Sequence, residues 1–317
     1  MKKIDRRQFI KTGIRAGVAI GSLAVLPQLF ASELSSDAGV SNISVVSGTD
    51  YFNNTLKAIR QLGGIEKFIS KGDKVGLLAN SDYKKPGTYT RPDIVLAVAH
   101  LCLEAGASQI YCLKNESEKY WRRSPLFDTH QKLISHLRED DTDHRMVDIP
   151  NGKVLKEANV LDGFLDYDKV INIPIVKNHG ELRMTCTLKN TMGISAFSTN
   201  IQFHTGPNVI TGAVKMLTDS YYHDREYLAQ CIADLNRVRK FNLYVVDATE
   251  FITTNGPTGP GNLSKLNNVV AGTDPVAVDA FCCRYLNLAP EKELVIKKAY
   301  ENNLGEINLN KLNIGEI

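Results

Sequence analysis

The sequence predicts a three-layer α/β/α fold around a mixed, largely parallel sheet. Short apolar runs such as Lys74–Ala79 and Lys169–Ile175 have the length and composition of buried strands. Longer segments between such runs carry apolar residues at helical spacing. One strand–helix–strand unit spans residues 74–113, and a connection of that kind joins parallel neighbours.

This unit gives the clearest local signals. Thr90 is expected to cap a helix that has Pro92 in its first turn and ends at Gly106. The second strand, Gln109 to Leu113, follows directly. The remaining elements are expected in this order: strand 43–46, helix 50–62, helix 128–137, strands 145–149 and 169–175, helix 224–239, strands 241–246 and 267–271, and helices 274–286 and 292–302.

These elements place one α/β domain at residues 42–317. The pattern between residues 181 and 188 fits neither a helix nor a strand clearly, so a subdomain at 181–240 stays open. The composition, with 43% hydrophobic and 23% charged residues among 317, is that of a globular protein, which excludes disorder, collagen and coiled coil.

The formal charge of +3 has a local origin. Residues 1–31 contain six of the 38 basic residues but only one of the 35 acidic residues, so the rest of the chain has a slight acidic excess. A nucleic-acid-binding surface is therefore not expected.

The first residues, Asp5-Arg6-Arg7-Gln8-Phe9-Ile10-Lys11, resemble a bacterial twin-arginine (Tat) export signal. An uncharged run over 16–30 follows, which is shorter than the roughly 20 residues of a membrane-spanning helix. We therefore expect a Tat signal peptide at 1–31, a linker at 32–41, the Tat translocase as an export partner, a periplasmic location and no stable transmembrane segment. An uncut signal would tether the protein to the membrane, and a basic start before an ordinary anchor is the alternative.

The six cysteines do not form a C-x-x-C pair. No iron–sulfur cluster is therefore expected, and no disulfide framework can be assigned.

Polar residues follow several predicted strands. Asn80 follows the first strand of the unit, Lys177, Asn178 and His179 follow Lys169–Ile175, and Asp247 and Asp274 follow the two later strands. The carboxyl ends of parallel strands share one edge, where open α/β sheets bind ligands. The sequence therefore predicts a site at this edge, framed by Lys189, Asn190 and Gly193 and by a glycine-rich loop with Gly256, Thr258 and Gly259. That loop could equally be a tight surface turn.

Three of these side chains suit chemistry on an anion. Lys177 and Lys189 would bind a carboxylate or phosphate, and a desolvated lysine can serve as a base or Schiff-base nucleophile. His179 would transfer a proton or, with His204 and Asp247, hold a divalent transition metal. The alternatives are solvated lysines, a satisfied loop histidine, Asp274 as a helix cap and Asp247 as an acceptor for backbone amides.

Taken together, five motifs in order resemble the family named domain of unknown function 362 (DUF362). They are Lys71–Val75, Thr90–Asp93 with Glu104–Ala107, Ile173–His179 with its Pro and Lys-x-His, Thr187–Gly193 with its Lys-Asn-x-x-Gly, and Gly256–Gly259 with Asp274–Asp279. The resemblance covers roughly Val75 to Leu286. It implies the fold and the site, while some relatives carry a ferredoxin-like module whose C-x-x-C clusters this chain lacks.

Two functions are compatible with this resemblance. One is an enzyme that acts on a small anionic substrate, with Lys177, His179 and Lys189 as its catalytic residues. The other is a non-catalytic periplasmic protein that binds an anion or helps to mature a metal cofactor.

Overall fold

The computed structural model describes residues 42–206 and 224–317, which belong to one compact unit. The expected signal peptide (1–31) and linker (32–41) lie outside the described residues. Within the described ranges, no helix has the length and apolar character needed to span a membrane.

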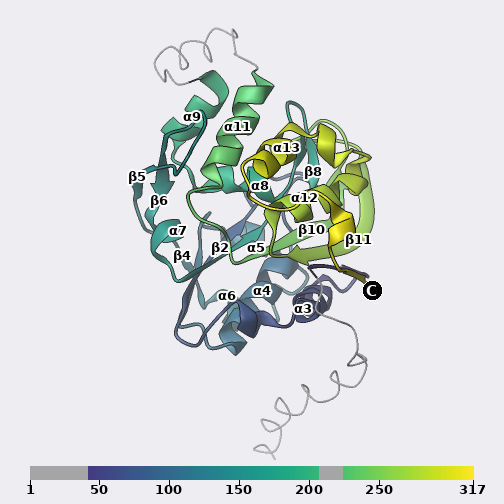
Figure 1. The fold of residues 1–317 in the computed structure, drawn as a ribbon. Helices are drawn as coiled ribbons and strands as arrows, with labels where there is room; N and C mark the ends of the chain where they lie inside the picture. Colours follow the sequence, from purple (N-terminus) through teal and green to yellow (C-terminus); the bar gives the residue numbers. More distant parts are fainter. Residues whose placement is uncertain (1–41, 207–223) are drawn as a thin grey trace, which may run out of the picture. The chain divides into compact units, whose positions relative to one another are not determined.

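An eight-stranded sheet forms the middle of the fold (Figure 1). Its spatial order is β12-β1-β11-β10-β7-β2-β3-β4. The strands are β1 (Ile43–Ser47), β2 (Lys74–Ala79), β3 (Gln109–Cys112), β4 (Leu137–Glu139), β7 (Lys169–Ile173), β10 (Leu243–Ile252), β11 (Leu263–Gly272) and β12 (Ile314–Glu316). Two small antiparallel pairs lie outside this sheet: β5 (His144–Asp148) with β6 (Glu157–Leu161), and β8 (Lys177–His179) with β9 (Arg183–Thr185).

Most neighbours in the main sheet are parallel. The five strands β4, β3, β2, β7 and β10 run in one direction, whereas β11 is antiparallel to both β10 and β1. The chain passes from β2 outward to β3 and β4 and later returns to β7 on the other side of β2. This reversal makes the carboxyl ends of β2 and β7 a topological switch point, where a crevice opens in folds of this type.

Helices cover both faces of the sheet (Figure 1). In the part of the chain that the structure describes, they are α3 (Tyr51–Gln61), α4 (Pro92–Glu104), α5 (Glu118–Trp121), α6 (Gln131–Ile134), α7 (Asp162–Asp166), α8 (Thr187–Asn190), α9 (Phe197–Thr205), α11 (Arg225–Leu235), α12 (Pro275–Cys282) and α13 (Leu294–Glu301).

Alternating side chains of each strand form two separate cores. In β2, Leu77 packs with α3 and α4, whereas the next residue, Leu78, packs on the opposite side with α8, α11 and α12. In β10, Val245 and Val246 divide in the same way. This period of two follows from strand geometry and confirms the predicted three-layer α/β fold with a mixed, largely parallel sheet.

Three features of the expected elements differ clearly from the structure. The expected helix at 128–137 is a single turn, α6, followed by the edge strand β4. The expected strand at 241–246 continues to Ile252, so Asp247 lies inside β10 rather than after it. The N-cap of α4 is Arg91 rather than Thr90, whose hydroxyl instead donates to the Ile173 carbonyl.

Candidate functional site

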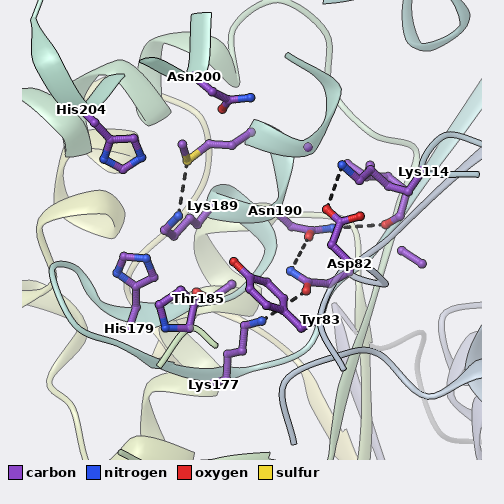
Figure 2. Close-up of a pocket in the computed structure, with 16 residues that line it drawn as sticks. Asp82, Tyr83, Lys114, Lys177, His179, Thr185, Lys189, Asn190, Asn200 and His204 are labelled. Atoms are coloured by element: carbon purple, nitrogen blue, oxygen red, sulfur yellow. Dashed lines mark hydrogen bonds and ion pairs between the residues drawn. The ribbon is translucent and has the colours of Figure 1, made fainter. Parts of the chain in front are cut away.

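A cavity of about 370 Å³ opens beyond the carboxyl ends of β2, β3 and β7. Seven of the residues predicted from the sequence line it: Asn80, Lys177, His179, Lys189, Asn190, Gly193 and His204. Figure 2 shows Asp82, Tyr83 and Lys114 on one side of this cavity and His179, Lys189 and His204 on the other. The switch point of the sheet therefore brings together residues that are more than 100 positions apart.

Lys177 forms the floor of the cavity and is fully buried. Its Nζ donates to the Thr88 carbonyl and to Asn80 Oδ1 (3.2 Å), and lies 3.8 Å from the centroid of the Tyr83 ring. Burial, and secondarily the charge of Lys189, lowers the pKa of Lys177 to about 7. These three neighbours match the three N–H groups of an ammonium, so Lys177 is satisfied within the protein.

A chain of side-chain amides connects Lys177 to helix α8, which carries Lys189. Asn80 Nδ2 donates to Asn190 Oδ1 (3.0 Å). Asn190 Nδ2 in turn donates to Asn172 Oδ1 (2.7 Å) and to the Leu78 carbonyl (3.2 Å). These bonds hold the ends of β2 and β7 against α8. Asn80 and Asn190, which were predicted to bind a ligand, therefore also have a structural role.

Lys189 lies on α8, a single helical turn. Among the described residues, the only hydrogen-bond acceptor of its Nζ is Met192 Sδ, at 3.4 Å. A thioether sulfur is a weak acceptor. Burial lowers the pKa of Lys189 to about 8, although the nearby Glu181 carboxylate opposes the shift. At pH 7 the Lys189 amine is therefore mostly protonated, with a larger neutral fraction than an ordinary lysine, and it has donor capacity left for a ligand.

Asp279 of α12 holds the start of α8 from behind. The Asp279 carboxylate is buried and accepts from the Thr187 amide (2.8 Å), the Thr187 hydroxyl (2.6 Å) and the Leu188 amide (3.2 Å). Burial raises the pKa of Asp279 to about 6, and the bonds from Thr187 oppose that rise. Asp279 thus supplies the cap that the short helix lacks in its own sequence.

The ring of His179 has a defined hydrogen-bond arrangement. Nδ1 accepts from the backbone amides of Glu181 (3.3 Å) and Leu182 (3.2 Å). Burial, with smaller contributions from the charges of Lys189, His204 and Lys177, lowers the pKa of His179 to about 3. The ring is therefore neutral at pH 7 with its proton on Nε2, which makes it a hydrogen-bond donor to a ligand rather than a base.

Thr185 of β9 is a cavity residue that the sequence prediction missed. Its Oγ1 is buried, and no hydrogen-bond partner for it exists among the described residues. His204 of α9 lies across the cavity with its Nδ1 3.6 Å from Glu181 Oε2. A buried hydroxyl without a partner is costly, and one that lines a cavity is available to a ligand.

The other missed residues come mainly from loops. Asp82 and Lys114 form an ion pair of 2.9 Å at the rim, and Tyr83, Met192, Asn200 and Pro257 complete the lining. Lys114 follows the carboxyl end of β3, so the strand-end argument applied to Asn80 would have found it. Tyr83 and Asn200 carry no comparable signal in the sequence.

The family model described as Domain of unknown function (DUF362) matches residues 74–284, more than half of the chain. The chain belongs to the DUF362 family. All the cavity residues lie within the matched segment.

Proteins similar to this DUF362 chain include one from Synechocystis and one from Thermotoga maritima. A thylakoid-associated protein of Synechocystis is 27% identical over 172 residues, which are 49% of this chain and 50% of that protein. The chain thus matches about half the length of this curated relative. A crystal structure of a protein from Thermotoga maritima has 13% identity and a TM-score of 0.40, with coverage of 80% of this chain and 60% of that one.

The two predicted aspartates of this DUF362 protein do not line the cavity. The Asp274 carboxylate caps α12 through the amides of Val276 (2.9 Å) and Ala277 (3.0 Å). Because β11 is antiparallel to β10, its carboxyl end lies at the opposite edge of the sheet from the cavity. The strand-end argument therefore does not apply to β11, and Asp274 is the helix cap that the sequence offered as an alternative.

Asp247 is likewise occupied by structural bonds. Its carboxylate accepts from the Arg91 amide (2.7 Å), at the start of α4, and from the amide and hydroxyl of Thr249 (2.9 and 2.7 Å). It does not line the cavity with His179 and His204. Within residues 42–206 and 224–317, no three His, Cys, Asp or Glu side chains are grouped so that they could hold a metal ion. The predicted metal set is therefore not brought together in this structure.

The glycine-rich loop joins β10 to β11 and meets the site at one point. Pro257 lines the cavity, whereas Gly256, Thr258 and Gly259 do not. Gly256 packs against β8: its amide donates to Asn178 Oδ1 (3.0 Å), and a Cβ at this position would lie 1.7 Å from the Asn178 carbonyl oxygen. Gly256 and Asn178 thus fix the loop to β8. Gly193, a cavity residue in the 3-10 turn Thr191–Ile194, lies close to Leu78: a Cβ at Gly193 would be 3.3 Å from Leu78 Cδ1.

Proposed function

We propose that this DUF362 protein is an enzyme that acts on a small anionic substrate in the cavity, with Lys189 as the group that engages the substrate. The observation that carries the proposal is the state of the Lys189 amine. It is desolvated, faces the cavity and has only a thioether acceptor among the described residues. A desolvated ammonium gains most from a partner of opposite charge.

Other cavity groups support an anion. The His179 Nε2–H is a hydrogen-bond donor at the cavity, and so is the Thr185 hydroxyl, which has no partner among the described residues. The volume of about 370 Å³ falls at the lower end of small-molecule sites, which run from roughly 300 to 1,000 Å³. We therefore expect a substrate of the size of a small metabolite.

Catalysis is favoured over simple retention because of the lysine pKa values. Burial lowers the pKa of Lys177 to about 7 and the pKa of Lys189 to about 8. In this range an amine can exchange protons or attack an electrophile at neutral pH.

A thermal-shift panel tests the proposal. Pyruvate, glyoxylate, malonate, citrate, inorganic phosphate and glycerol phosphate would each be added to wild type, Lys189→Met and the exposed-lysine control Lys132→Met. We expect at least one anion to raise the Tm of wild type and of the control but not of Lys189→Met. Equal stabilisation of Lys189→Met, or no stabilisation of wild type, would contradict the proposal. Conversion of the bound anion, followed by proton NMR, separates an enzyme from a periplasmic binding or cofactor-maturation protein.

We also propose export through the Tat translocase to the periplasm, on the basis of Arg6, Arg7 and the uncharged run that follows. Replacing both arginines by lysine keeps the charge while removing the motif. We expect wild type in the periplasmic fraction and the double variant in the cytoplasmic fraction of a Tat-competent bacterium. Equal distribution of the two proteins would contradict export by this route.

A further inference from the structure

We infer that the substrate carries an aldehyde or ketone next to its anionic group, as in a 2-oxo acid, and that Lys189 Nζ forms a Schiff base with that carbonyl carbon. This inference rests on the proposed function, since it assumes that the cavity binds an anion. It adds the electrophile and the covalent step, and it assigns the nucleophile to one of the two cavity lysines.

The choice between the lysines follows from their partners. Lys177 Nζ is covered by the Thr88 carbonyl, Asn80 Oδ1 and the Tyr83 ring, and its side chain is fully buried. Attack by Lys177 would require all three neighbours to move. Lys189 is partly exposed, and its only acceptor in the described part of the chain is the Met192 thioether. Its lone pair is therefore the one that a ligand in the cavity can reach.

The surroundings also suit the electrophile. His179 has its Nδ1 engaged by two backbone amides, which leaves Nε2–H as a neutral donor for a carbonyl oxygen. The Thr185 hydroxyl, which has no partner among the described residues, is a further donor for a carboxylate beside that carbonyl. Burial lowers the pKa of Lys189 to about 8, which leaves a useful fraction of free amine at neutral pH.

The covalent step needs no oxidant or reductant. The Lys189 lone pair forms the C–N bond while the C=O π pair moves to oxygen, and the proton released by nitrogen is taken up by that oxygen. The C–O bond of this carbinolamine then breaks. Its oxygen leaves as water with a second proton from nitrogen, and the nitrogen lone pair completes the C=N bond. Amine and carbonyl thus give imine and water.

Reductive trapping tests the step. Wild type would be incubated at pH 7.5 with glyoxylate or pyruvate and sodium cyanoborohydride, and the intact mass and tryptic peptides measured. We expect one adduct at Lys189, equal to the mass of the ligand acid less one water plus the two hydrogens of reduction, and at least about tenfold above the level at exposed Lys132. An adduct spread evenly over exposed lysines, or located at Lys177, would overturn the assignment.

Lys189→Arg is the matched variant, since it keeps the positive charge and removes the nucleophile. Oxamate, whose carbonyl is an unreactive amide, serves as the binding probe. We expect Lys189→Arg to lose the adduct while oxamate still raises its Tm. Oxamate binding to wild type without any adduct from glyoxylate or pyruvate would overturn the Schiff base and leave the anion site standing. Failure of every anion to bind wild type would overturn both proposals.

Discussion

Lys177 and Lys189 are the same residue type in one cavity, but they belong to walls that are built differently. The wall of Lys177 closes around its amine with a carbonyl, an amide oxygen and an aromatic ring. The wall of Lys189 places the amine next to a thioether and otherwise toward the cavity. Two lysines in one cavity are therefore not equivalent. The hydrogen bonds of Lys177 are made within the protein, whereas Lys189 has donor capacity left for a ligand.

The largest expected loss of stability comes from removing the Asp279 carboxylate, which caps the helix that carries Lys189. Asp279→Ala leaves the Thr187 hydroxyl and the amides of Thr187 and Leu188 without their acceptor. We expect a loss of about 2–4 kcal/mol in the free energy of unfolding, measured by urea denaturation, together with the loss of anion binding.

Asp274→Ala is the control, because it removes a cap from the same helix, α12, but at a point away from α8. It should cost about 1 kcal/mol and leave anion binding intact. Loss of binding in Asp274→Ala would show that general loosening of α12, rather than the cap on α8, controls the cavity.

Replacing each lysine by Met compares the two walls directly. Lys177→Met leaves the Thr88 carbonyl and Asn80 Oδ1 without a donor, and we expect a loss of about 1–3 kcal/mol in the free energy of unfolding. Lys189→Met removes a desolvated ammonium that lacks a strong acceptor, and we expect a change within about 0.5 kcal/mol or a gain in stability. Equal costs in chemical denaturation would contradict the distinction.

The pH dependence of stability follows from the lowered pKa of Lys189. Its pKa is about 8 in the folded protein and 10.5 as the ordinary value, so the unfolded chain binds more protons between these limits. Its contribution to stability is present above pH 10.5 and is lost as pH falls through 8. The stability of wild type relative to Lys189→Met should therefore rise between pH 8 and 9.5, by at most about 1.4 kcal/mol per pH unit. A flat or falling difference would contradict the burial of an ammonium at this position.

The smallest expected effect is at Thr185. Thr185→Val keeps the shape and removes a buried hydroxyl that has no partner among the described residues. We expect stability unchanged within about 0.5 kcal/mol, or slightly increased, in denaturation experiments. Anion affinity should fall by about tenfold if the hydroxyl serves the ligand. A stability loss above about 1 kcal/mol would show that the hydroxyl has a structural partner.

The sequence predicted the layers and the sheet because short apolar runs and the βαβ unit are local features, and the structure confirms both. It also predicted that the carboxyl ends of the strands that begin at Lys74 and Lys169 would share one edge of the sheet. In the structure this edge brings Asn80 next to Lys177. The strand-end argument failed at Asp274 because β11 forms a hairpin with β10, the preceding strand, and so runs antiparallel to it. The prediction treated the glycine-rich loop as part of the site and did not consider it as the turn of that hairpin.

Roles within the site were harder to predict than its location. Lys177 and Lys189 have similar local surroundings in the sequence, and only the fold shows that the loop at 80–89 satisfies one of them. The role of His179 was equally hidden, because the two amides that occupy Nδ1 depend on the turn after β8. Export and the identity of the ligand stay predictions.

The most direct test of the central claim is the pH dependence of anion affinity, measured by titration calorimetry with oxamate from pH 6.5 to 9.5. If Lys189 is the ligand-binding cation, affinity in wild type should be constant below about pH 8 and fall by up to about tenfold per pH unit above it. In Lys189→Arg the fall should vanish, because arginine stays charged. Affinity that is flat to pH 9.5 in wild type, or that falls equally in Lys189→Arg, would contradict the account.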